Sequence, residues 1–99
     1  MIIKIQSIHF DADQKLIDFI QKKMDKLDTF FDRVTDAEVY LKLEKDISGN
    51  NKVVQIKLNI PGNAILAKEQ AAWFEEATDK AYETLKRQLS KHKDKVSSH

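Results

Sequence analysis

Rows of lysine and arginine are the residues in this sequence whose type and spacing could do chemistry. At about 100° per residue on a helix, the cations of residues 15–33 gather in one narrow band opposite the apolar positions, with one lysine beside it. The cations of residues 80–93 form a second band, with two lysines beside the apolar stripe. Such rows match the phosphates of a folded RNA, and the arginine fork can hold two phosphate oxygens. The candidate RNA-binding residues from these bands are Lys22, Lys23, Lys26, Arg33, Lys86, Arg87, Lys91 and Lys93.

Positive charge is concentrated at the C-terminal end. Residues 80–99 hold six basic and two acidic side chains, for a net charge of +4, whereas residues 1–79 sum to −3. Lys95 belongs to this basic end and joins the candidate residues. A basic end on a near-neutral domain is typical of a protein that meets an anionic partner, such as nucleic acid or a membrane surface. A solvated helical surface with ion pairs such as Asp18 with Lys22 explains the same rows, and both explanations stay open on the residues alone.

The inventory of residue types argues against an enzyme. The 99-residue chain has no cysteine and two glycines, so it lacks a thiol nucleophile, a glycine-rich phosphate loop and a dinucleotide fingerprint. Its three histidines include no pair at metal-ligand spacing. We therefore expect no catalytic residue, no cofactor and no metal site. Without a basic leader or an apolar run near the ~18 residues of a membrane span, the chain is expected to be cytoplasmic.

Two aromatic residues allow a second kind of RNA contact. An exposed aromatic ring beside lysines can stack on a base. A tryptophan near the start of a helix more often covers the edge of the core, and this is what we expect of Trp73. Tyr40 lies on a strand that lacks the exposed aromatic pair of an RNA-recognition sheet.

Hydrophobic periodicity predicts the elements that must position the cations. Asp13 is the expected N-cap of the first helix. The predicted order is β-α-β-β-β-α, an α+β fold with a four-stranded mixed sheet and two helices packed on one face. The first two strands are expected to be parallel and the other pairs antiparallel. We expect one domain over residues 1–95 and a frayed tail over residues 96–99. The predicted strands cover residues 3–7, 37–44, 54–60 and 64–67, and the predicted helices cover about residues 14–32 and 69–93.

Three segments carry a resemblance to a known family. Residues 85–95 read Leu-Lys-Arg-Gln-Leu-Ser-Lys-His-Lys-Asp-Lys, which is similar to a C-terminal helix signature of Arg-Gln-Leu followed by a Lys-His-Lys-Asp-Lys run. Residues 23–33 and residues 39–45 are similar to the first helix and the second strand of the same family. On these residues the chain resembles the ribosome hibernation-promoting factor family, also called ribosome-associated inhibitor or protein Y, in its short form.

The resemblance implies a fold similar to a double-stranded RNA-binding domain, placed in the mRNA and tRNA channel of the small ribosomal subunit. There the candidate residues other than Lys22, which the resemblance does not cover, are expected to neutralise phosphates of small-subunit rRNA. The domain is expected to block initiation by steric occlusion in starved or stationary cells. The expected partners are the small subunit and its rRNA, without a membrane or a small-molecule substrate. The chain is expected to be a monomer off the ribosome, and promotion of inactive ribosome dimers and silencing of single ribosomes both stay open.

Two other functions compete with this one. A generic double-stranded RNA-binding domain needs a lysine cluster at the start of its last helix, and residues 67–70 offer one lysine and a glutamate. A protein-interaction domain would bind through the polar face of the sheet, which leaves the basic helices without a role.

Overall fold

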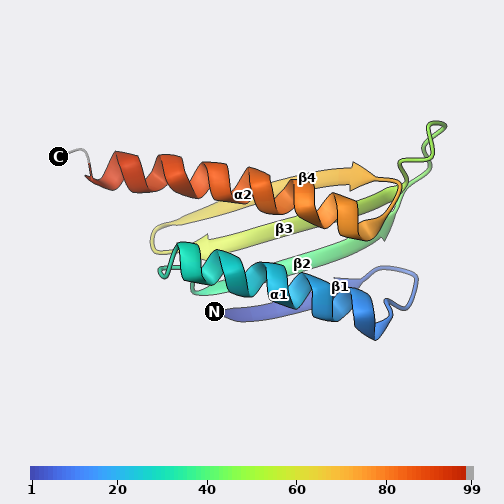
Figure 1. The fold of residues 1–99 in the computed structure, drawn as a ribbon, viewed down its shortest axis with the longest axis horizontal. Helices are drawn as coiled ribbons and strands as arrows, with labels where there is room; N and C mark the ends of the chain where they lie inside the picture. The colour runs from blue at the N-terminus through green and yellow to red at the C-terminus, as the bar shows by residue number, and fades with distance from the viewer. Residues whose placement is uncertain (98–99) are drawn as a thin grey trace.

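Strands and helices follow one another in the predicted order, β-α-β-β-β-α (Figure 1). The structure, a computed structural model, describes the backbone of residues 1–97 and the side chains of residues 1–92. The elements are β1 (Ile2–Ser7), α1 (Gln14–Phe30), β2 (Asp36–Leu43), β3 (Lys52–Ile60), β4 (Asn63–Ala71) and α2 (Phe74–Ser97).

The strands lie in the sheet in the order β1-β2-β3-β4. β1 pairs with β2 in parallel, and the other two pairs are antiparallel, as predicted. Successive side chains of a strand alternate between the two faces, so residues in register form rows across the sheet. One such row on the buried face runs through Ile5, Val39, Ile56 and Ala67.

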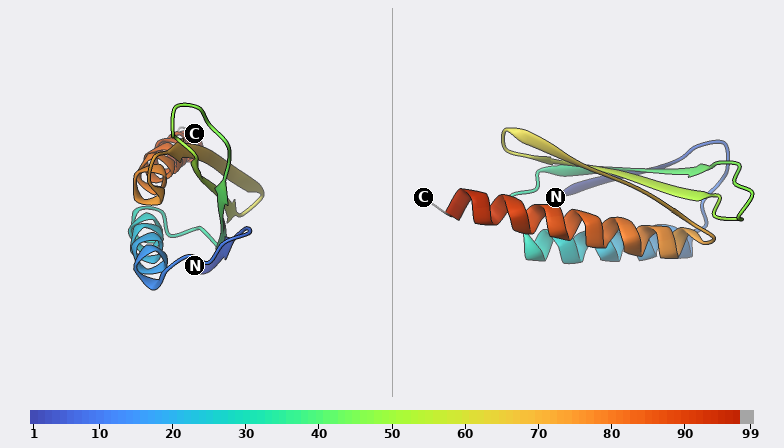
Figure 2. Two further views of the ribbon diagram at one scale, coloured as in Figure 1. Left: turned by 90° about the vertical axis from the view of Figure 1, so that its right-hand side faces the viewer. Right: turned by 90° about the horizontal axis from the view of Figure 1, so that it is seen from above.

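Both helices cover the same face of the sheet, and the molecule therefore has two layers (Figure 2). The helices lie side by side and run in the same direction, and the C-terminal end of α2 extends beyond both α1 and the strands (Figure 1). A single core fills the space between the layers. α1 contributes Leu16, Ile20, Met24 and Leu27 to this core, and α2 contributes Ala77, Ala81, Leu85 and Leu89.

α1 begins as predicted and ends two residues earlier than predicted. The Asp13 carboxylate accepts a hydrogen bond from the Leu16 backbone N–H at 2.8 Å, which caps the first turn. The helix ends at Phe30 because Phe31 adopts an extended backbone with φ of −142° and turns its ring into the core. Arg33 therefore lies in the connection to β2 and not on the helix whose spacing placed it in the first band.

The boundary between β4 and α2 differs from the sequence prediction. β4 continues to Ala71 and α2 begins at Phe74, whereas the sequence predicts a strand that ends at residue 67 and a helix from residue 69. Residues 68–71 are good helix formers, but they pair in register with residues 52–55 of β3, and this tertiary pairing overrides local propensity. The observed start of α2 carries Glu75 and Glu76 and no lysine cluster, so it still counts against a generic double-stranded RNA binder.

The last helix is also longer than predicted. α2 continues to Ser97, so residues 96 and 97 belong to the helix and not to a frayed tail. Residues 98 and 99 lie outside the described part of the chain.

Trp73 does not cover the core, contrary to the sequence prediction. It lies in the short connection between β4 and α2, and 69% of its surface is exposed. Phe74 takes the buried position instead and stacks on Phe10 with ring centroids 5.1 Å apart. These stacked rings close the core at the end where both helices begin.

Candidate nucleic-acid interface

The two flanks of α1 carry opposite charges and face different neighbours. On the acidic flank, the Met1 ammonium donates to the Asp28 carboxylate at 3.2 Å, which places this flank beside β1. On the basic flank, Lys23 Nζ lies 2.8 Å from Asp79 Oδ1 of α2. Lys23 therefore lies on the side of α1 that faces the second helix.

We call the line where the two helices meet on the outer surface the helix seam. The ammonium group of Lys23 lies 5.7 Å from the Phe19 ring centroid and 5.2 Å from the Tyr82 ring centroid. The Lys86 ammonium lies 5.4 Å from the Phe30 ring centroid and 6.0 Å from that of Tyr82. Such distances allow cation–π attraction in each case. The helix seam consists of Phe19, Lys23 and Phe30 from α1 and Asp79, Tyr82 and Lys86 from α2.

Lys22 and Lys26 lie next to the helix seam on α1. Both are exposed, and neither has a carboxylate within 4 Å in the described part of the chain. Their i,i+4 spacing places them on the same face of α1. This face is turned by about 100° or less from the direction in which Lys23 points. They extend the positive charge of the helix seam along α1.

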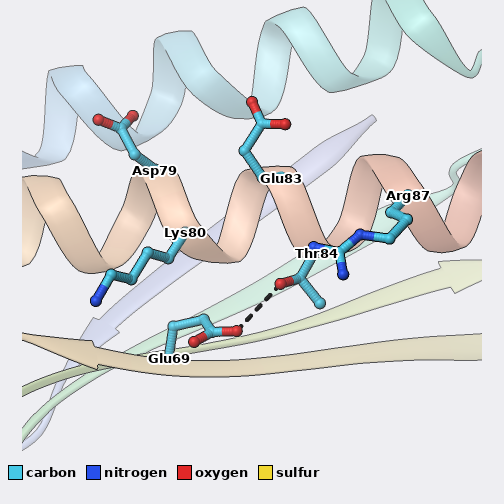
Figure 3. A pocket seen from close by; sticks show the side chains of 6 residues that line it. All are labelled: Glu69, Asp79, Lys80, Glu83, Thr84 and Arg87. Atoms are coloured by element: carbon cyan, nitrogen blue, oxygen red, sulfur yellow. Dashed lines mark hydrogen bonds between the residues drawn. The ribbon is translucent and has the colours of Figure 1, made fainter.

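The opposite side of α2 faces β4 and carries a second set of cations, which we call the outer flank: Lys80, Arg87 and Lys91. A shallow hollow of about 350 Å³ lies along it, lined in part by Glu69, Lys80, Thr84 and Arg87 (Figure 3). Thr84 donates a hydrogen bond to the Glu69 carboxylate at 3.1 Å. Lys80 Nζ lies 3.9 Å from Glu76, whereas Arg87 has no ion pair with any described residue.

The predicted RNA-binding residues thus lie mainly in two groups, one at the helix seam and one on the outer flank, and the others belong to neither group. Lys23 and Lys86 meet in the helix seam, with Lys22 and Lys26 beside it, and Arg87 and Lys91 share the outer flank. Arg33 is exposed in the connection after α1. The side chains of Lys93 and Lys95 lie outside the described residues. Sequence reasoning missed the role of Tyr82, because the i,i+4 step to Lys86 is visible in the sequence but the contact with Lys23 depends on how the helices pack.

The solvent face of the sheet has lysines but no row of them. Lys68 pairs with Glu44 at 3.4 Å, and Lys42 donates to the Gln55 side chain at 3.1 Å. Tyr40 donates to Glu38 at 3.2 Å, and the Glu38 charge, with this hydrogen bond, raises the pKa of the Tyr40 hydroxyl. Interleaved acids and amides make this face a poor match for a phosphate backbone.

The described residues offer little for other chemistry. They contain no group of three or more histidine, cysteine, aspartate or glutamate side chains placed to hold a metal ion. The helices of the described part include none whose length and apolar character would let it cross a membrane. The rows of cations on the helix layer are therefore the feature that needs a functional explanation.

Comparisons with known proteins bear on what these cations meet. The family model described as Sigma 54 modulation protein / S30EA ribosomal protein matches residues 3–97. A ribosome hibernation promoting factor from Escherichia coli is 31% identical over 99 residues, which cover 100% of both chains. One from Pseudomonas putida is 32% identical over 99% of this chain and 92% of its own. A ribosome hibernation promotion factor from Deinococcus radiodurans is 33% identical over 93% of this chain, which spans only 49% of that relative.

Two solved structures share the fold. A ribosomal subunit interface protein from Coxiella burnetii superposes with a TM-score of 0.85 at 22% identity, over 94% of this chain and 98% of that one. The N-terminal domain of Protein Y from Thermus thermophilus superposes with a TM-score of 0.78 at 25% identity, over 93% of this chain and 99% of that one.

Proposed function

Because the chain belongs to the Sigma 54 modulation protein / S30EA ribosomal protein family, we propose that it is a ribosome hibernation factor that binds the rRNA of the small subunit through its helix layer. The names of the relatives from Escherichia coli and Pseudomonas putida support the hibernation role. One structural observation carries the proposal. Both helices present exposed cations that have no ion pair with any described residue: Lys22 and Lys26 beside the helix seam, and Arg87 and Lys91 on the flank of α2 that faces β4.

These cations bind phosphates and do not discriminate between bases. Neutralising a phosphate releases condensed counterions, which favours binding at low salt and weakens it as salt rises. In this proposal Arg33, Lys93 and Lys95 add further phosphate contacts beyond the two helical groups. Register on the ribosome then follows from the shape of the rRNA and not from its sequence.

The mechanism is occlusion without catalysis. A domain with extents of 47 × 26 × 19 Å fills the space that mRNA and initiator tRNA need in the channel of the small subunit. Occupation of this channel blocks initiation in the cytoplasm of starved or stationary cells, and needs no nucleotide, metal or turnover. Ribosomes silenced in this way are the ones that would pair in any later formation of inactive dimers.

Co-sedimentation with purified small subunits over a salt series tests the RNA-binding half of the proposal. With ~5–8 phosphate contacts, log affinity should fall linearly with log salt with a slope of several units. Lys57→Glu, an exposed change on the solvent face of the sheet, is the matched control and should leave the affinity unchanged within about twofold, because this surface lies outside the proposed contact. A flat salt dependence contradicts the electrostatic contact. Free RNA duplex that competes as well as small subunits favours a generic double-stranded RNA binder.

The order of addition in a purified translation system tests occlusion. Protein added before initiation should inhibit strongly, and one molecule per ribosome should saturate the effect. Protein added to pre-formed elongation complexes should inhibit weakly, because the channel already holds a codon–anticodon pair. Equal binding to vacant ribosomes and elongation complexes rules out channel occlusion even if rRNA binding survives.

A further inference from the structure

Tyr82 contacts both lysines of the helix seam. Its ring centroid is 5.2 Å from the Lys23 ammonium and 6.0 Å from the Lys86 ammonium, so the two ammonium groups lie within about 11 Å of each other. The ring is half-buried and packs against the core as part of α2. One fixed aromatic side chain therefore contacts a cation from each helix.

Each lysine also has a second aromatic partner of its own. Lys23 lies over Phe19 at 5.7 Å, and Lys86 lies over Phe30 at 5.4 Å. Only 23% of the Lys23 side chain is exposed, while its partner Asp79 is 53% exposed, so the lysine is largely covered beside a half-exposed carboxylate. Both cations are held in place before any ligand arrives.

Such an arrangement favours binding because a free lysine loses side-chain entropy when it is fixed on a phosphate. A lysine already held between aromatic rings loses less. Lys23 has an anionic partner in the free protein, since Asp79 lies 2.8 Å away, whereas Lys86 has no ion pair with any described residue. An incoming phosphate therefore competes with Asp79 for Lys23 and meets Lys86 without competition.

We propose that the helix seam is a phosphate subsite for an RNA backbone, in which Lys23 and Lys86 bind phosphate oxygens and Tyr82 is the positioning residue that holds both ammonium groups. The inference rests on the proposed function for the identity of the RNA. It adds to that function a specific pair of cations and an uncharged residue on which their affinity depends.

A double-mutant cycle on small-subunit binding tests the positioning role. Tyr82→Leu should weaken binding about fivefold, since two cation–π contacts are lost, and Tyr82→Phe should restore wild-type affinity within about twofold, because the ring face is kept. In a Lys23→Gln/Lys86→Gln background, Tyr82→Leu should change the affinity by less than about twofold, because nothing remains to be positioned. An equal loss in both backgrounds overturns the inference, because Tyr82 then acts on the RNA or on the fold by itself. A Tyr82→Phe variant as weak as Tyr82→Leu also overturns it.

Side-chain NMR gives a readout that does not depend on ribosomes. The εCH₂ signals of Lys23 and Lys86 should show ring-current shifts in the wild type and move toward ordinary lysine values in Tyr82→Leu, with the cooperative thermal unfolding retained. Unchanged signals overturn the positioning role. Failure of the wild type to bind small subunits overturns the proposed function and the RNA subsite together. Binding without coupling between Tyr82 and the lysines overturns the subsite alone.

Discussion

The two sides of α2 carry similar charges but hold them in different ways. Toward α1, Lys86 lies over two aromatic rings, and the neighbouring Lys23 is fixed by Tyr82 and Asp79. On the outer flank, Arg87 and Lys91 are exposed and have no carboxylate within 4 Å among the described residues. The difference shows that charge and order are separate properties of a binding surface. Cations held in place favour affinity through a smaller entropy loss, and free cations favour adaptation to an irregular phosphate backbone.

The largest effect is expected from a core substitution in α2, because the cations on both sides of this helix depend on its packing. Leu85 lies fully buried on the core-facing side of α2, and Leu85→Ala should lower the free energy of unfolding by ~2–5 kcal/mol, a large share of the ~5–10 kcal/mol expected for a domain of this size. Urea denaturation measures the loss. Ribosome binding through both groups of cations should fall together near the new unfolding midpoint. A loss of one group alone would mean that the two sides do not share a core.

Charge reversal separates the two sides directly. Lys23→Glu/Lys86→Glu and Arg87→Glu/Lys91→Glu should each weaken small-subunit binding by at least about tenfold and reduce the salt slope by about two. The pair in the helix seam should also lower the melting temperature, because it removes ring contacts and places a carboxylate beside Asp79. The outer-flank pair should change the free energy of unfolding by no more than about 1 kcal/mol. Unfolding of the outer-flank variant would show that Arg87 or Lys91 makes contacts that stabilise the fold.

Removing the negative charge of Asp79 should increase the difference in RNA affinity between the helix seam and the outer flank. Asp79→Asn frees Lys23 from its 2.8 Å partner and should tighten small-subunit binding about two- to fivefold at low salt. The free energy of unfolding should change by less than about 1 kcal/mol, since half of the Asp79 side chain is exposed. Glu76→Gln on the outer flank is the matched control and should have a smaller effect, because its ion pair with Lys80 is 3.9 Å long. Weaker binding by Asp79→Asn would mean that Asp79 positions Lys23 for the RNA.

The smallest effect is expected in the β2–β3 connection, away from both sides of α2. Hydrogen bonds from the Ser48 backbone N–H and hydroxyl lower the pKa of Asp46 below its ordinary 3.8. A lowered carboxyl pKa means that its stabilisation is complete above pH 3.8 and is lost as the pH falls through the folded-state value. An NMR titration of the Ser48 amide should show a midpoint below pH 3.8. A midpoint above that value would contradict the hydrogen-bonded connection.

Local pattern was enough to predict most of the fold. Strict alternation from Ala37 to Leu43 and from Val54 to Ile60 predicts half-buried strands, and the structure pairs them in antiparallel register. Asp13 caps α1 as its residue type indicates. These features are predictable because the period of apolar residues along a strand and the side chain of an N-cap are local properties of the sequence.

The candidate site was only partly predictable. Helical spacing puts the cations on the correct helices, but it cannot tell that Lys23 contacts Tyr82, since these residues meet through the packing of two helices. Arg33 does not lie on α1 with the other predicted cations, because Phe31 turns into the core and the helix ends before it. β4 continues to Ala71 because this residue pairs with Lys52 of β3. The sequence alone does not show this pairing, and the helix propensity of residues 68–71 therefore predicts a strand end that is too early.

The order of strands in the sheet has a consequence for folding kinetics. β2, β3 and β4 pair with their neighbours in the chain through connections of eight and two residues, whereas β1 reaches β2 across 28 residues that include α1. Short loops close at a small entropic cost, and longer ones raise the barrier. We expect the β2–β3–β4 meander to form early and the parallel pairing of β1 to come late. The rate-limiting step is then the docking of the N-terminal strand.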